Sequence, residues 1–183
     1  MTKSRWTAVA VVGLVVASLI GAGSGSLAGP RQRDHVGTGH AVATRGATTF
    51  EPNSNITSTL RFGADRIVVN SGDQVRWVHR DSDPDPHTIT VVAPDEVPKS
   101  VGDVFGGNCP SCDHAFEGHF GGGGLVRKVE DEDDAEFGLD GPGDSLWLDP
   151  GAKITATVSA APGTRLNYIC VIHPWMIGKI RVN

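Results

Sequence analysis

The chain is short of basic residues and of repeats. Its 16 lysines and arginines stand against 21 aspartates and glutamates, which gives a formal net charge of −5. An acidic excess argues against nucleic acid as a partner and suits a protein that meets basic surfaces on other proteins. No repeat of solenoid length occurs, so we expect the 183 residues to form one domain with a tail or a long loop left over.

Long apolar runs are also missing, apart from one within residues 1–28. Lys3 and Arg5 precede this run, and small residues follow it up to Ala28. That order is typical of a secretory signal cleaved after Ala28, so we expect export to the periplasm, the cell surface or the medium. The alternative is an uncleaved membrane anchor, although the apolar core falls short of the ~20 residues that a spanning helix needs.

Residues 29–49 show no periodicity and are rich in small residues, so we expect a flexible linker. Residues 50–183 then consist of short runs in which apolar and polar residues alternate. A period of two is typical of strands that bury one face, and it predicts an all-β domain built as an antiparallel sandwich. The expected strands are 56–62, 66–70, 74–78, 87–91, 145–148, 153–158, 165–170 and 179–182.

Residues 94–144 break this rhythm and are expected to be a long loop inserted between core strands. A loop of this length is uncommon without a purpose or disorder. We expect one short strand within it, near 125–129. The acidic run 130–136 is expected to be a solvated loop; alternatively, it steers a basic partner protein.

Four side chains suited to one metal ion are expected to meet at an end of the sandwich. Cys170, His173 and Met176 lie within seven residues of each other, between two predicted strands. His87 opens another strand, directly after two prolines that alternate with two aspartates and indicate a turn. Pairing of the two strand ends would bring His87 to Cys170.

Two imidazoles, one thiolate and one weak thioether form the ligand set of a mononuclear blue-copper, or type 1, site. The sulfur ligands suit Cu(I), whereas the imidazoles serve both oxidation states. A buried set of this kind leaves no open position for a substrate, so it favours single-electron transfer over catalysis. We therefore expect an electron carrier without catalytic residues.

The pattern Cys-x2-His-Pro-x-Met-x-Gly at 170–178 resembles the cupredoxin family of blue copper proteins, which includes plastocyanin and amicyanin. The two-residue gap between its histidine and methionine is more similar to the gap in amicyanin than to the longer gaps in plastocyanin and azurin. The resemblance covers roughly 57–92 and 145–183, whereas the segment 94–144 departs from amicyanin.

The resemblance implies an eight-stranded Greek-key sandwich and redox partner proteins. We expect the protein to be a monomer. It also implies that the ring of His173 reaches the surface within an apolar patch, with Trp175 nearby, and provides the exit for the electron. Thr88 is expected to tie the two ligand segments together by hydrogen bonds.

Cys109 and Cys112 form a Cys-x-x-Cys motif within the inserted segment. In an oxidising compartment we expect these two cysteines to form a disulfide. A thioredoxin-like redox motif is a weaker alternative, because no strand-then-helix pattern surrounds it. In a third reading, Cys109 and Cys112 hold a second metal ion together with His114 and His119.

Two other functions remain open at this stage. A copper-dependent oxidoreductase would need further histidines, usually in His-x-His pairs, and this chain contains no such pair. A copper-binding or copper-delivery protein would use the same four ligands, so the sequence does not separate it from an electron carrier.

Overall fold

The computed structural model describes residues 36–37, 40–131 and 136–183. The expected signal or anchor segment, 1–28, lies outside the described residues. Within the part that the structure describes, no helix has the length and apolar character needed to cross a membrane.

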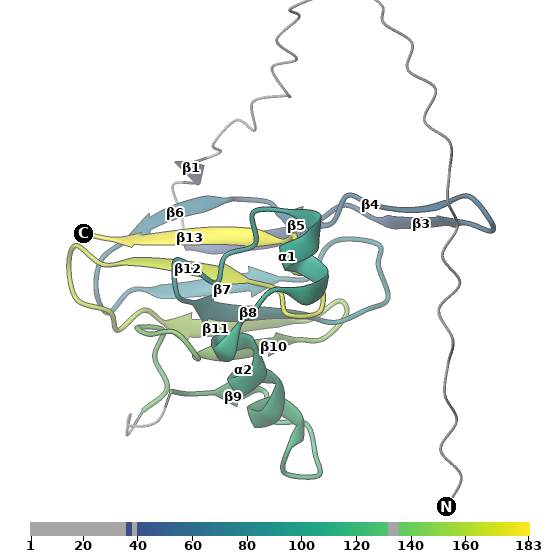
Figure 1. Cartoon of the computed structure of the whole chain (residues 1–183). Coiled ribbons are helices and arrows are strands. Elements are labelled where there is room, and N and C mark those ends of the chain that lie inside the picture. Colours follow the sequence, from purple (N-terminus) through teal and green to yellow (C-terminus); the bar gives the residue numbers. More distant parts are fainter. Residues whose placement is uncertain (1–35, 38–39, 132–135) are drawn as a thin grey trace, which may run out of the picture. The chain divides into compact units, whose positions relative to one another are not determined.

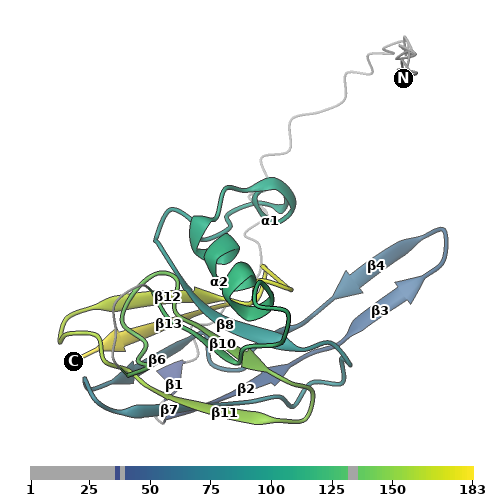
Figure 2. The same ribbon diagram turned by 90° about the horizontal axis from the view of Figure 1, so that it is seen from below.

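Two β-sheets pack face to face, as Figures 1 and 2 show. The strands of the larger sheet are, in spatial order, β1 (Val36–Gly37), β6 (Arg66–Val69), β13 (Ile177–Val182), β12 (Arg165–Ile169), β8 (His87–Val92), β10 (Ser145–Leu148) and β9 (Lys128–Val129). Those of the smaller sheet are β11 (Lys153–Thr157), β7 (Gln74–Val78), β2 (Ala41–Arg45) and β5 (Arg61–Phe62).

Alternate residues of both sheets enter one shared core. On β7, Val75 and Trp77 are fully buried, whereas the residues between and before them are exposed. Tyr168 on β12 packs edge-on against Phe62 and Trp77, with ring centroids 4.8 Å and 6.0 Å apart. Edge-to-face contact of this kind adds to the stabilisation from burial alone. The predicted β-sandwich is therefore confirmed.

The sheets are mixed rather than purely antiparallel. β6 pairs in parallel with β1 and β13, and β2 pairs in parallel with β7. Only strands joined by a tight turn must run antiparallel, and these partners are not joined in that way.

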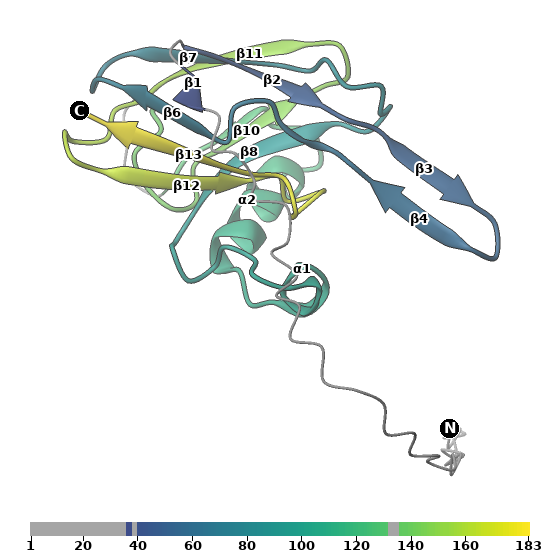
Figure 3. The ribbon, with the colours of Figure 1, turned by 90° about the horizontal axis from the view of Figure 1, so that it is seen from above.

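The expectation of a flexible linker over 29–49 is wrong from residue 41 onward. β2 begins at Ala41, and Val42 is fully buried in the core. The next two strands, β3 (Thr48–Glu51) and β4 (Asn55–Ser58), form a hairpin that projects from the sandwich (Figure 3). The single strand expected at 56–62 is thus divided between β4 and β5.

The inserted segment contains two helices that sequence reasoning missed. They are α1 (Val101–Gly106) and α2 (Pro110–Phe120), and they lie over the outer face of the larger sheet (Figure 2). The buried stripe of α2 is narrow, formed by Ser111, Ala115 and His119. Two of these three residues are polar, so no apolar periodicity marked the helix. β9 confirms the short strand expected near 125–129, and residues 132–135 of the acidic run lie outside the described residues.

Candidate metal centre

The ends of β12 and β8 bring Cys170 and His87 together. The two strands pair antiparallel with Ile169 opposite Thr90, so the end of β12 lies beside the start of β8. His87 is the first residue of β8, and Cys170 directly follows β12. The convergence expected from the sequence therefore follows from strand pairing.

Three donor atoms meet in this pocket. The Nδ1 atoms of His87 and His173 lie 3.2 Å apart, and they lie 3.8 Å and 3.7 Å from the Sγ atom of Cys170. Donors bound about 2.0–2.3 Å from one ion in a trigonal plane would be separated by roughly 3.5–3.8 Å. The three observed distances fit a single metal ion with little rearrangement.

Burial prepares the two rings for metal binding. Desolvation lowers the pKa of His87, against the opposing effect of Asp81. It also lowers the pKa of His173, against the effect of three aspartates in the β7–β8 loop. Both rings are therefore neutral at neutral pH, the form that binds metal.

Cys170 differs, because burial raises the pKa of its thiol, although hydrogen bonds from Thr88 partly oppose this effect. A metal ion would have to displace the thiol proton in order to gain the thiolate.

The loop that follows Cys170 is held by its own backbone. The Cys170 N–H donates to the Met176 carbonyl over 3.1 Å, and the Met176 N–H donates to the His173 carbonyl over 2.8 Å. The Met176 side chain is fully buried in the core cluster that includes Cys170. A Cβ atom at Gly178 would collide with the ring of Tyr168, which explains the glycine in the motif.

Thr88 joins the two ligand segments, as expected. Its backbone N–H points at the Sγ atom of Cys170 over 3.3 Å, and its hydroxyl oxygen accepts the Val171 N–H over 2.8 Å. Thr88 and Cys170 are fully buried. The first contact satisfies the sulfur, and the second fixes where the metal loop leaves β12.

A buried chain of hydrogen bonds continues from Thr88 to α2. The Thr90 hydroxyl donates to that of Thr88 over 3.0 Å and lies 2.8 Å from the Ser145 hydroxyl. Ser145 is in turn 2.8 Å from Nε2 of His119, whose Nδ1–H donates to the Val126 carbonyl over 2.6 Å. His119 is therefore engaged with β10, away from the cysteine pair.

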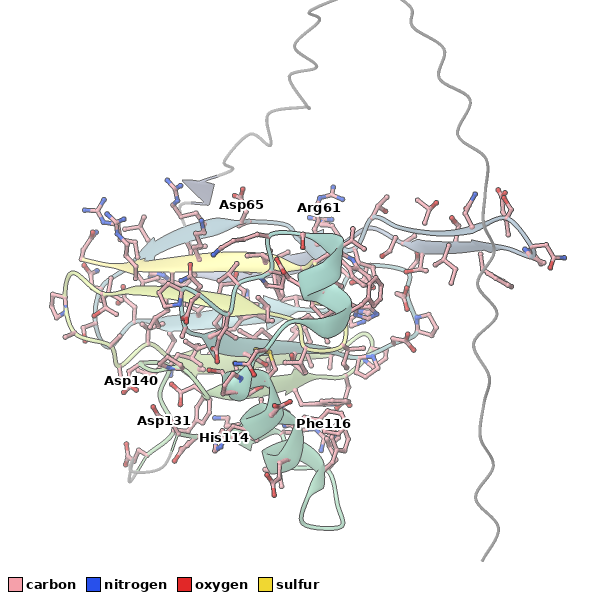
Figure 4. All side chains as sticks on the ribbon, viewed as in Figure 1. Arg61, Asp65, His114, Phe116, Asp131 and Asp140 are labelled. Atoms are coloured by element: carbon pink, nitrogen blue, oxygen red, sulfur yellow. A yellow bond between two sulfur atoms is a disulfide. The ribbon has the colours of Figure 1, made fainter. Side chains whose placement is uncertain are left out.

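The cysteine pair of the insertion forms a disulfide between Cys109 and Cys112, which confirms the lead expectation. Within the described residues, His114 forms no hydrogen bond with either cysteine. Its Nε2 atom lies 2.9 Å from the Glu130 carbonyl. In Figure 4 it is seen on α2 beside the loop that carries Asp131. The alternative second metal site is thus not assembled in the part of the chain that the structure describes.

Sequence reasoning missed two residues that contact His87. The ring of His79 stacks on the ring of His87, with centroids 4.8 Å apart. The Oδ2 atom of Asp81 lies 2.9 Å from Nε2 of His87. A signal was present, because every second position of the segment is acidic or histidine: His79, Asp81, Asp83, Asp85 and His87.

The surface edge of the centre is formed by His173, which is only 6% exposed. The ring of Trp175, 37% exposed, lies 5.4 Å from the ring of His173. Oδ2 of Asp85 lies 3.9 Å from Nε2 of His173. Both an aromatic side chain and an acidic side chain therefore lie next to His173.

No protein-family model matches the chain, and no curated protein matches it. Several solved structures are similar to part of the chain. A purple cupredoxin from Nitrosopumilus maritimus has 14% identity and a TM-score of 0.40, over 79% of this chain and 100% of that one. A reduced auracyanin from Roseiflexus castenholzii has 15% identity and a TM-score of 0.40, over 80% and 99%. A mutant of amicyanin has 15% identity and a TM-score of 0.38, over 78% and 82%.

The two packed sheets agree with the β-sandwich expected from the sequence. His87, Cys170 and His173 form one buried cluster at the end of β8 and β12.

Proposed function

We propose that this protein carries single electrons through one type 1 copper ion held by His87, Cys170, His173 and Met176. The observation that supports this proposal most strongly is the convergence of two imidazole nitrogens and one thiol sulfur in a buried pocket, at the spacing of one ion. Met176 is proposed as the weak fourth ligand, because it closes the same loop and its side chain is fully buried.

Bound copper would supply the chemistry, by changing between Cu(II) and Cu(I) with the gain or loss of one electron. The chain's own residues would keep the ligand geometry nearly the same in the two oxidation states. Paired strands and the hydrogen-bonded loop hold the donors in place, and burial of His87 and Cys170 excludes water. His173, next to the partly exposed Trp175, is the proposed point where the electron enters or leaves.

Export by the N-terminal segment, monomeric behaviour and transfer to redox partner proteins belong to the same proposal. The net charge of −5 suits a partner with a basic docking surface. Association with such a partner should slow as salt is added, because the attraction is screened.

Reversible voltammetry separates an electron carrier from a copper-delivery protein, which shares the ligands. We expect the copper-loaded protein to give a reversible one-electron wave with fast self-exchange. We also expect it to keep its copper in the presence of an apo-acceptor protein, because its ligands are buried. Rapid surrender of copper to the acceptor, without a reversible wave, would instead establish a delivery function.

A further inference from the structure

The β7–β8 loop places a carboxylate against the outer nitrogen of His87. Oδ2 of Asp81 lies 2.9 Å from Nε2 of His87, and both side chains are fully buried. Nδ1 of the same ring faces His173 and Cys170, so Nε2 is the nitrogen left to carry the proton. The Nε2–H of His87 therefore donates to Asp81.

Asp81 is itself held from two other sides. Its Oδ1 atom accepts the backbone N–H of Asp83 over 3.1 Å. The side chain of Thr44, fully buried on β2, lies close to the carboxyl group of Asp81 and favours its charged form. The carboxylate is thus fixed by groups from its own loop and from the smaller sheet, and it cannot turn away from His87 without leaving buried donors unpaired.

His79 closes the remaining face of the ring. Its ring is stacked on that of His87 with an interplanar angle of 24°, and its Nε2–H donates to the Asp85 carbonyl over 3.1 Å. The ring of His87 is consequently held in its plane by Asp81 and along its face by His79.

We propose that Asp81 is a positioning residue of the copper centre, an inference that rests on the function proposed above. Its carboxylate fixes the ring of His87 with Nδ1 toward the metal and places a negative charge behind that ligand. A carboxylate in this position raises the basicity of a metal-bound imidazole. It stabilises Cu(II) more than Cu(I), because the charge on the ion is larger. Asp81 therefore lowers the reduction potential.

The test compares Asp81→Asn with the wild-type protein, both loaded with copper. The amide keeps the size of the side chain and an oxygen that can accept the Nε2–H, but it removes the charge. We expect the affinity for Cu(II) to fall about 10- to 100-fold, the affinity for Cu(I) to fall less, and the reduction potential to rise.

Asp85→Asn is the matched control, because it removes one charge from the same loop. The Asp85 side chain is 62% exposed, so solvent screens its charge. We expect a smaller rise in potential for this variant. Equal shifts in the two variants, or none for Asp81→Asn, would overturn the role of Asp81.

A measurement on the wild-type protein covers the case in which Asp81→Asn fails to fold. In the diamagnetic Cu(I) form, nuclear magnetic resonance should show the Nε2–H of His87, protected from exchange with water. Rapid exchange of this proton would contradict the inference. A wild-type protein without a thiolate-to-copper absorption band would refute the proposed function itself, so the two failures are distinguishable.

Discussion

The hydroxyl oxygen of Thr88 accepts the backbone N–H of Val171 over 2.8 Å, directly beside the proposed copper ligand Cys170. This bond links the start of β8 to the loop that carries the other proposed ligands. The ligand segments are separated in sequence by the helical insertion, and they are held together here by one side chain.

Replacing this residue, Thr88→Val, should loosen the link while keeping the shape of the side chain. The Val171 N–H and the Thr90 hydroxyl would each lose an acceptor, so we expect a loss of about 1–3 kcal/mol in the free energy of unfolding of the metal-free protein. Copper should also dissociate faster. Denaturant unfolding and the rate of copper transfer to a chelator measure the two effects. Thr48→Val, in the exposed hairpin, is the control. Equal losses in both variants would show that the link contributes nothing specific.

Met176→Leu tests the proposed fourth ligand. Leucine fills nearly the same volume, so the metal-free protein should lose less than about 1.5 kcal/mol of stability. Loss of the thioether should leave the visible colour but change the reduction potential, because the weak axial ligand tunes it. We expect the potential to rise, since a donor to Cu(II) is removed. An unchanged potential would show that Met176 serves only as a core residue.

The pH dependence of stability tests the buried state of His119. Burial lowers the pKa of this ring below its ordinary value of 6.5. Below pH 6.5 the unfolded chain therefore binds a proton that the folded chain does not, and stability falls as pH decreases. Above that value the contribution is fully present.

Urea unfolding of the metal-free protein at about pH 7.5 and about pH 5.5 measures this effect. His119→Gln removes the titrating group, whereas both proteins keep the other histidines. We expect the wild-type protein to lose more stability on acidification than the variant. Parallel losses would mean that His119 does not contribute.

Counting thiols tests the pairing of Cys109 and Cys112. The denatured, metal-free protein should show one free thiol, that of Cys170, and three after reduction. Three free thiols before reduction would contradict the disulfide.

Much of the sandwich could be predicted because apolar and polar residues alternate along its strands. The bounds expected for 74–78 and 145–148 agree with β7 and β10 to the residue. The proposed ligands Cys170 and His173 were visible as a motif, since a strand end and a short loop bring nearby residues together. His87 was found because it opens a strand after a turn.

Other contacts were beyond sequence reasoning because they depend on how irregular chain folds back. Asp81 contacts His87 through an irregular loop, and the alternation of acidic residues and histidines in that loop does not indicate which of them faces His87. His119 was considered as a metal ligand beside the cysteines, yet α2 turns its buried stripe toward the larger sheet. Helix orientation is set by packing, which local patterns do not specify.

The most direct test of the copper centre is a copper K-edge X-ray absorption spectrum of the loaded protein. The account predicts one ion per chain with two nitrogen ligands and one short sulfur ligand, and loss of that sulfur in Cys170→Ser. A spectrum with only nitrogen and oxygen neighbours, or one that Cys170→Ser leaves unchanged, would contradict it.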